Sequence, residues 1–402
     1  MKVGGALPIH EPRIAIVHPR LGFGGSESVA LWAIEALKGR AEVSLITGGE
    51  VDLARLNEYY GTDIRPGEIS ILRAPMPLGL GNSAKFAGLR WRFVDRYCKR
   101  IAREFGLIIN TYGPCDFGVP AVQCIADFSF AGEWRDRLNP ALADHRRWWY
   151  GDSPLRKAYL GLCGLISTPG SEAWKTNLTL ANSCWTAALL KEQFGVESRV
   201  VYPPVAGSFP PVEWAERENG FVCVGRVVPE KRMDTVIRIL ERVRAAGHNV
   251  HLHILGGLDD SEFGRKIRQM AEQRREWVFL EGRVAGPKKD AIIAAHRFGI
   301  NGRELEPFGI APAEMVKAGC ITFVPSSGGQ TEIVDHPLLA FADEEDAAQK
   351  ICTVLASETL QQTLRTHLNL AAQRFSAAEF MRSIREIVQE LLLQNVAAAK
   401  AD

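Results

Sequence analysis

Short apolar segments alternate with amphipathic ones along most of this 402-residue chain. The first apolar run, residues 13–18, predicts a buried strand, and the helical spacing of apolar residues in 28–37 predicts the helix after it. Further strands are predicted at residues 42–47, 69–73, 107–110, 119–125, 178–182 and 199–202. A helix between two strands brings the chain back to the end of the sheet where the first strand began, so successive strands run in the same direction. This order predicts an α/β fold with parallel sheets and right-handed connections.

The alternation stops at a proline-rich segment, residues 203–211, and then begins again. Strands are predicted at 221–225, 250–255, 278–280 and 321–324, and helices at 233–246, 262–274 and through most of 347–395. A chain of this length fits two domains. We therefore expect one domain over residues 1–204, a second over 205–375, and a C-terminal helix over 376–402 that packs back toward the first.

Composition narrows the classes of protein that fit. The 48 Lys and Arg residues nearly balance the 47 Asp and Glu residues. The net charge therefore gives no reason to expect binding to nucleic acid. No apolar run is long enough to span a bilayer and no signal peptide is visible, so we expect a cytoplasmic protein. The eight cysteines are scattered, which argues against zinc or a disulfide framework and favours reduced thiols.

Two carboxylates, Glu306 and Glu314, flank a turn that should open a helix. A proline and a glycine in this turn prevent the helix from starting before Ile310. The free amides of the turn would then point out of the helix N-terminus, where a phosphate or a sugar hydroxyl can bind. They belong to Phe308, Gly309 and Ile310. A lone Glu at the position of Glu314 would more often be a solvated helix acid favoured by the macrodipole.

A second glycine turn, residues 326–331, follows the strand predicted at 321–324, and Glu332 stands at its far side. The carboxyl ends of the strands in one parallel sheet would therefore carry two amide-rich turns and three acids.

The glycine turn at residues 22–27 connects the first strand to the first helix, as in dinucleotide-binding folds. The third glycine of that fingerprint would fall at Glu27, so the fingerprint fails, and the Lys-Ser/Thr of a P-loop is also absent. Gly24 and Gly25 could still let the backbone approach a ligand closely, or could simply form a tight connection.

Two cations flank the first strand of the second half. Arg226 follows the strand and Lys231 begins the next helix, which places both outside the carboxyl ends of the strands, where α/β sheets bind ligands. Alone, they would more often be surface residues near a turn.

Taken in order, these segments resemble retaining glycosyltransferases of the two-Rossmann-domain (GT-B) fold, in particular the fourth sequence family, the glycosyl transferases group 1. Glu306 and Glu314 match its Glu-x7-Glu motif, Arg226 and Lys231 its Gly-Arg-x4-Lys motif, and Gly24-Gly25-Ser26-Glu27 its Gly-Gly-x-Glu turn. The resemblance extends from about residue 22 to residue 332.

The resemblance implies transfer of a hexose from a nucleotide-diphosphate sugar to a hydroxyl acceptor, in glycan biosynthesis at the cell surface. The donor would lie between an acceptor-side first domain and a nucleotide-sugar-binding second domain, without a metal or other cofactor. Arg226, Lys231 and the amides of the turn would hold the diphosphate, Glu314 the ribose, and Glu306 the transferred sugar. A donor phosphate oxygen would take the acceptor proton.

One position departs from the family. Members often carry a His in the first domain that touches the transferred sugar, and here Asp127 stands in the best-matching segment. Asp127 could bond a sugar hydroxyl or act on the acceptor, or it could cap the turn after a strand. Two other functions share these features: a nucleotide-sugar epimerase of the same fold, and a non-catalytic protein that binds sugar nucleotides.

Two stretches rich in cations and aromatics, residues 85–103 and 133–157, suggest contact with an anionic membrane surface. A packed helix with a solvated basic face is the simpler explanation of the first stretch. The pair leads us to expect an acceptor that could be lipid-linked and a protein that could lie at the inner face of the membrane.

Overall fold

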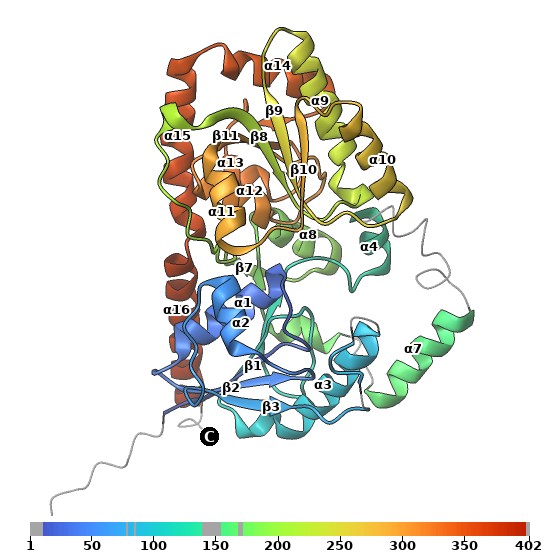
Figure 1. Ribbon diagram of the computed structural model, residues 1–402. Coiled ribbons are helices and arrows are strands. Elements are labelled where there is room, and N and C mark those ends of the chain that lie inside the picture. Colours follow the sequence, from blue (N-terminus) through green and yellow to red (C-terminus); the bar gives the residue numbers. More distant parts are fainter. Residues whose placement is uncertain (1–10, 78, 84–85, 139–153, 168–171, 399–402) are drawn as a thin grey trace, which may run out of the picture.

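The structure is a computed structural model that describes residues 11–77, 79–83, 86–138, 154–167 and 172–398. Two parallel sheets lie one beyond the other along the molecule, each with helices on both sides (Figure 1). The first has the strand order β3-β2-β1-β4-β5-β6-β7 and the second β10-β9-β8-β11-β12-β13. This is the α/β, GT-B fold that the sequence predicts.

The first sheet and its helices come from the N-terminal half of the chain. Its strands are β1 (Arg13–Val17), β2 (Glu42–Thr47), β3 (Ser70–Arg73), β4 (Leu107–Asn110), β5 (Val122–Ile125), β6 (Leu178–Ala181) and β7 (Ser198–Val200). Its helices are α1 (Gly25–Leu37), α2 (Leu53–Tyr60), α3 (Ala87–Ile101), α4 (Gly132–Leu138), α7 (Pro154–Ile166) and α8 (Cys184–Phe194). Strand β5 is shorter than the predicted 119–125 because Pro120 has no N–H to donate to a sheet.

The second sheet consists of β8 (Glu218–Val224), β9 (His251–Leu255), β10 (Val278–Gly282), β11 (His296–Ile300), β12 (Ile321–Pro325) and β13 (Ala340–Phe341). Its helices are α9 (Met233–Ala245), α10 (Glu262–Glu272), α11 (Gly286–Ala295), α12 (Ile310–Lys317), α13 (Thr331–Val334), α14 (Glu344–Leu355) and α15 (Glu358–Ala372). The sequence analysis does not predict β11, which begins with two polar residues and contains a glycine.

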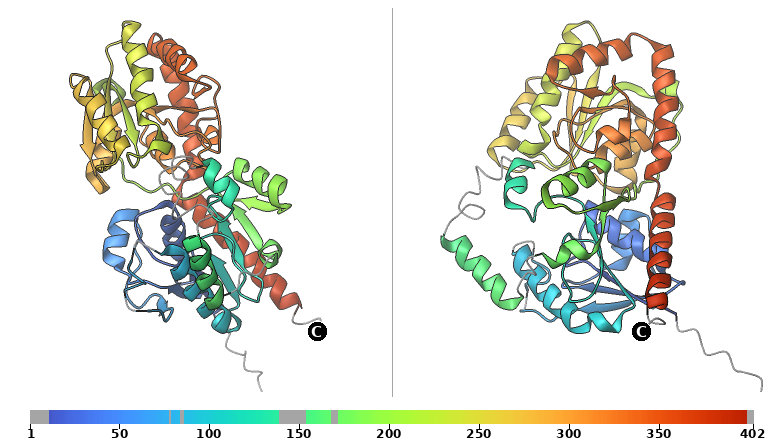
Figure 2. Two further views of the ribbon diagram at one scale, coloured as in Figure 1. Left: turned by 90° about the vertical axis from the view of Figure 1, so that its right-hand side faces the viewer. Right: turned by 180° about the vertical axis from the view of Figure 1, so that it is seen from behind.

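Helix α16 (Ala377–Ala398) leaves the second sheet and packs along α1 beside the first (Figure 2). Phe380, Ile384, Ile387 and Val388 are buried in the same cluster as strands β1 and β2. Arg385 donates from Nε to the carbonyl of Ala36 over 2.8 Å. The domain boundaries themselves stay predictions.

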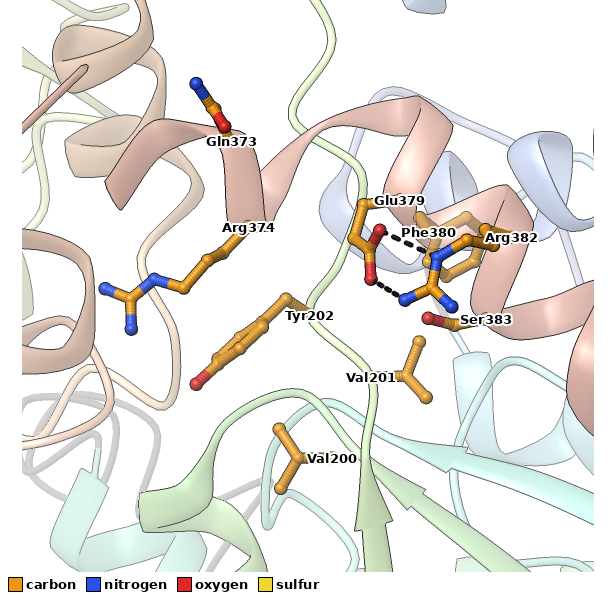
Figure 3. A pocket seen from close by; sticks show the side chains of 9 residues that line it. All are labelled: Val200, Val201, Tyr202, Gln373, Arg374, Glu379, Phe380, Arg382 and Ser383. Carbon is orange, nitrogen blue, oxygen red and sulfur yellow. Dashed lines mark hydrogen bonds and ion pairs between the residues drawn. The ribbon is translucent and has the colours of Figure 1, made fainter. Parts of the chain in front are cut away.

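The chain crosses between the two halves at two neighbouring segments. The first follows β7, the second precedes α16, and the amide of Val205 bonds the carbonyl of Phe375 over 3.0 Å. Side chains from both crossings, with Tyr202 and Arg374 among them, line a cavity of about 490 Å³ (Figure 3). None of the predicted donor-binding residues lines this cavity. We therefore assign it to the two crossing segments, here called the hinge.

Candidate functional site

In both sheets the strand order reverses direction at a strand whose carboxyl end carries a predicted site. Strand β1 lies between β2 and β4 and leads into the glycine turn, residues 22–27. Strand β8 lies between β9 and β11 and leads into Gly225 and Arg226. Such switch points are where open α/β sheets bind ligands.

The turn at residues 306–310, here called the donor-side turn, has the predicted form. Helix α12 begins at Ile310, and Gly309 precedes it with φ +106°, a left-handed conformation that suits glycine. A Cβ on Gly328 would lie 2.4 Å from the carbonyl oxygen of Glu306, so the second glycine turn also packs directly on this segment. Two glycines thus allow the backbone around Glu306 to take its shape.

Glu306 is a largely buried, ion-paired carboxylate whose side chain is 12% exposed. Its Oε2 lies 2.8 Å from Nζ of Lys231 and 3.5 Å from Nε of Arg303. Burial alone would raise its pKa, but the two cations outweigh burial and leave the pKa of Glu306 below the ordinary value. The side chain is therefore ionised at neutral pH.

The two predicted diphosphate-binding cations differ in their surroundings. Lys231 lies against Gly225, whose φ of +150° favours glycine, and is paired with Glu306. Arg226 is exposed and makes no ion pair or side-chain hydrogen bond with any residue that the structure describes. Arg226 is thus available to an anionic ligand, whereas Lys231 would be shared between a ligand and Glu306.

Glu314 lies one turn inside α12 and faces a different cation. Its Oε1 accepts a hydrogen bond from Nζ of Lys289 on α11 over 2.7 Å. Burial raises the pKa of Glu314, and although Lys289 opposes the shift, the net direction is upward. Lys289 was not predicted from the sequence, because no local pattern links α11 to α12.

The glycine turn of the first sheet faces the donor-side turn of the second. A Cβ on Gly25 would lie 3.6 Å from Cγ1 of Ile310, so the N-termini of α1 and α12 meet across the two halves. The hydroxyl of Tyr60 holds the glycine turn: it accepts from the amide of Gly24 over 2.7 Å and lies 3.0 Å from the carbonyl oxygen of Gly22. Tyr60 lies 36 residues away in sequence, so pattern reasoning gave no sign of it.

Asp127 follows β5 and is exposed. Its Oδ1 accepts from the amide of Ser129 over 2.8 Å, which is the turn-capping arrangement named as the alternative to a catalytic role. The catalytic role of Asp127 stays a prediction.

Glu332 has a partner that sequence reasoning did not anticipate. Its two carboxylate oxygens accept from the amides of Cys184 and Trp185, each over 2.9 Å, at the N-terminus of α8 in the other half. Tyr202 donates its hydroxyl to the same carboxylate over 2.9 Å. Glu332 therefore joins the two halves, and it does not add a third free acid to the mouth of the second sheet.

Ser183, the N-cap of α8, makes a second bond between the halves. Its hydroxyl donates to the carbonyl of Pro307 in the donor-side turn over 2.6 Å. The same oxygen accepts from the amide of Thr186 over 3.0 Å. The donor-side turn is therefore held from both sheets.

Residues 208–373 match the family model described as "Glycosyl transferases group 1". The chain is 24% identical to human alpha-1,3/1,6-mannosyltransferase ALG2, over 96% of this chain and 97% of that protein. It is also 24% identical to the Dictyostelium discoideum GDP-Man:Man(3)GlcNAc(2)-PP-Dol alpha-1,2-mannosyltransferase, over 56% of this chain and 50% of that protein.

Among solved structures, the chain resembles Anabaena Alr3699/HepE in complex with UDP and glucose. The TM-score is 0.63 at 15% identity, over 94% of this chain and 100% of that one. This likeness supports the fold, since the identity is too low to carry a substrate across.

Proposed function

We propose that this chain, whose residues 208–373 match the group 1 glycosyltransferases and whose fold is GT-B, moves a hexose from a nucleotide-diphosphate sugar to a hydroxyl acceptor with retention of anomeric configuration. The relatives' names mention mannosyl transfer, GDP-mannose and a dolichol-linked glycan. We therefore propose GDP-mannose as the donor and a lipid-linked glycan as the acceptor.

One observation carries this proposal: the glycine turn and the donor-side turn face each other beside one free and one paired cation. The approach of Gly25 to Ile310 brings two helix N-termini to the same place. Helix N-termini attract phosphate because their amides are unpaired and the dipole is positive there. Arg226 adds a cation without a partner among the described residues. A diphosphate between the halves would meet both amides and charge.

The chemistry follows from that placement. As the bond between the sugar C1 and the diphosphate breaks, negative charge grows on the phosphate oxygens, and the amides with Arg226 and Lys231 would stabilise it. Fixed donors of this kind act without a metal ion. The acceptor oxygen would bond C1 on the face that the diphosphate leaves, and its proton would pass to a donor phosphate oxygen.

Glu306 and Glu314 would take different parts. Glu306 is ionised and adjoins Lys231, so it would hold hydroxyls of the transferred sugar at the point where the diphosphate departs. Glu314, deeper along α12, would bind the ribose hydroxyls, with Lys289 fixing its carboxylate.

The described surface also supports a membrane-proximal acceptor. Helix α7 exposes Leu155, Leu160, Leu162 and Leu165, the last with 84% of its surface accessible. It packs against α3, which presents Arg96 and Arg100 to solvent. Exposed leucines beside cations are typical of a helix at a membrane interface. In the described residues, no helix has the length and apolar character needed to cross a bilayer.

The predicted basic face needs one correction. Arg90 of α3 is not solvated: it is buried and donates to the carbonyl of Leu80 over 3.3 Å. Of the second stretch, residues 139–153 lie outside the described residues. The membrane proposal therefore rests on α7 together with the exposed arginines of α3.

Thermal-shift titration with GDP-mannose, UDP-glucose and ADP-glucose tests the donor, since a ligand that binds only the folded state raises the midpoint. GDP-mannose is expected to give the largest shift. Transfer to a diphosphate-lipid-linked glycan, followed by NMR of the new linkage, should show an α-anomer. Conversion of the donor without any acceptor would instead support the epimerase alternative.

A further inference from the structure

Four side chains with metal-ligating atoms gather at the amino ends of three strands in the second sheet. They are Glu218 of β8, His251 and His253 of β9, and His296 of β11. One ligand atom from each lies within 4.8 Å of the others. The candidate donor site adjoins the carboxyl ends of the same strands, so this cluster lies at the opposite ends of those strands.

The parallel register explains the cluster. Glu218 pairs with His296, and Gly220 pairs with His251, while His251 and His253 are two apart and share a face of β9. A Cβ on Gly220 would lie 2.1 Å from Nε2 of His251. The ring of His251 therefore occupies the space that a side chain at Gly220 would take. Gly220 lies on β8, the strand between β9 and β11.

Hydrogen bonds fix which nitrogen carries the lone pair. Nδ1 of His296 lies 2.7 Å from the carbonyl oxygen of Ile292, which can only accept, so Nδ1 carries the proton and Nε2 is a bare lone pair. Nδ1 of His253 lies 2.7 Å from Oε1 of Glu281, with the same consequence. Metal-binding histidines are usually oriented in this way, by a carbonyl or a carboxylate on the other ring nitrogen.

Two of the inward nitrogens have no hydrogen-bond partner. Nε2 of His296 and Nε2 of His251 are both buried and unbonded among the described residues. Nε2 of His251 lies 3.1 Å from Oε2 of Glu218 without forming a hydrogen bond. Buried polar atoms are normally hydrogen-bonded, so each of these two exceptions suggests that the nitrogen binds a ligand.

We propose that Glu218, His251, His253 and His296 bind a divalent transition-metal ion, with zinc the preferred occupant. Three imidazoles and one carboxylate are a donor set that suits zinc, which takes four ligands in a tetrahedron at about 2.0–2.2 Å. Such bonds require ligand atoms about 3.3 Å apart, so the four groups must draw together. Glu218 can do so readily because its side chain is 54% exposed. The ion would tie β9 and β11 to β8 and stiffen the second sheet.

Zinc was not expected from the sequence, because the scattered cysteines form no pairs with ligand spacing. These ligands come from three strands, and only His251 and His253 are close in sequence. The proposal concerns a site apart from the transfer chemistry, so it stands or falls independently of the proposed function.

The test uses untagged full-length protein that has been stripped with a chelator and titrated with zinc sulfate in a calorimeter. We expect one equivalent of zinc to bind and to raise the thermal midpoint. Glu218→Ala and His253→Gln should each lower the zinc affinity at least tenfold. Glu281→Ala, which removes only the orienting carboxylate, should lower it roughly 10- to 100-fold.

His336→Gln is the matched control, because His336 and His367 form a similar imidazole pair, with ring centroids 5.5 Å apart, but belong to no such cluster among the described residues. Its zinc affinity should equal that of the wild type. Glu218→Ala changes an exposed side chain and should fold, which circular dichroism checks. Absence of a saturable site, or unchanged affinity in Glu218→Ala and His253→Gln, would overturn the proposal.

Discussion

Glu306 and Glu314 are the same residue type in opposite electrostatic settings. The pKa of Glu306 is lowered by Lys231 and Arg303 despite burial, whereas burial keeps the pKa of Glu314 above its ordinary value. The stability that Glu306 contributes by being ionised is present above its ordinary pKa of 4.5 and is lost as pH falls through the lower folded pKa. The two carboxylates therefore differ in the direction of their pKa shifts, although each is paired with a lysine.

Glu306→Gln should therefore separate catalysis from binding. The substitution keeps the shape but removes the charge beside the reacting sugar, so transfer at saturating donor should fall at least tenfold while affinity for the nucleoside diphosphate changes little. Glu314→Gln is the comparison and should chiefly weaken nucleoside-diphosphate binding. Steady-state kinetics and calorimetric titration of both variants provide the check, and a wild-type transfer rate in Glu306→Gln would contradict the assigned role.

Replacing Arg226 or Lys231 with alanine should weaken donor binding in both cases, but the two variants should differ in their free energy of unfolding. Arg226→Ala removes an exposed, unpaired cation, so unfolding should be unaffected while nucleoside-diphosphate binding weakens by about 2 kcal/mol. Lys231→Ala also removes the partner of buried Glu306 and should lower the free energy of unfolding by about 3 kcal/mol. Chemical denaturation and titration of both variants test this. Equal stability of the two variants would show that the ion pair contributes nothing.

At the scale of single elements, the sequence predicts where most helices and strands lie, but not which side chains distant in sequence bond to one another. The start of α12 at Ile310 was predictable because a proline and a glycine restrict the backbone locally. The partner of Glu332 was not, because Cys184 and Trp185 lie almost 150 residues earlier, in a helix beside the other sheet. Strand β11 was missed because its buried position on the sheet, and not its composition, makes it a strand.

The contact between Glu332 and α8 should hold the two halves together. Glu332→Ala removes charge-assisted bonds to two helix amides and to Tyr202, which should cost about 2 kcal/mol. Proteolysis within residues 203–211 should become faster as the halves separate more often. Glu345→Ala is the control, because Glu345 is 63% exposed and its surface pair with Arg242 should contribute little. Equal cleavage rates in both variants would argue against this role.

Helix α7 should direct the protein to anionic membranes. Replacing Leu162 and Leu165 with Ser removes exposed apolar surface without disturbing a core. We expect this variant to sediment less with vesicles containing anionic lipid, and salt to release the wild type, because charge attraction is screened within about 8 Å at physiological ionic strength. Leu393→Ser on α16, also exposed, is the control. Failure of the wild type to sediment at low salt would favour a soluble acceptor.

The whole molecule contains two sets of buried clusters, one in each half, and α16 belongs to the cluster of the first half. Phe221, Phe298 and Phe323 lie in the core of the second sheet, whereas Ile384 of α16 lies in the core of the first. The repeated alternation and the proline-rich segment made two units predictable. The last helix was expected to pack back toward the first domain, although its apolar stripe alone would fit either core.

Two matched substitutions should distinguish the units. Ile384 and Ile351 are both almost fully buried, the first against the N-terminal sheet and the second in the core around α14. Each Ile→Ala change should cost about 2–5 kcal/mol through lost transfer energy and a residual cavity. Scanning calorimetry should show Ile384→Ala lowering one transition and Ile351→Ala lowering another. Because the proposed diphosphate-binding residues lie mainly on the second sheet, a nucleoside diphosphate should raise chiefly the transition that Ile351→Ala lowers. A single transition that both variants shift equally would mean that α16 and the hinge make the two halves one cooperative unit.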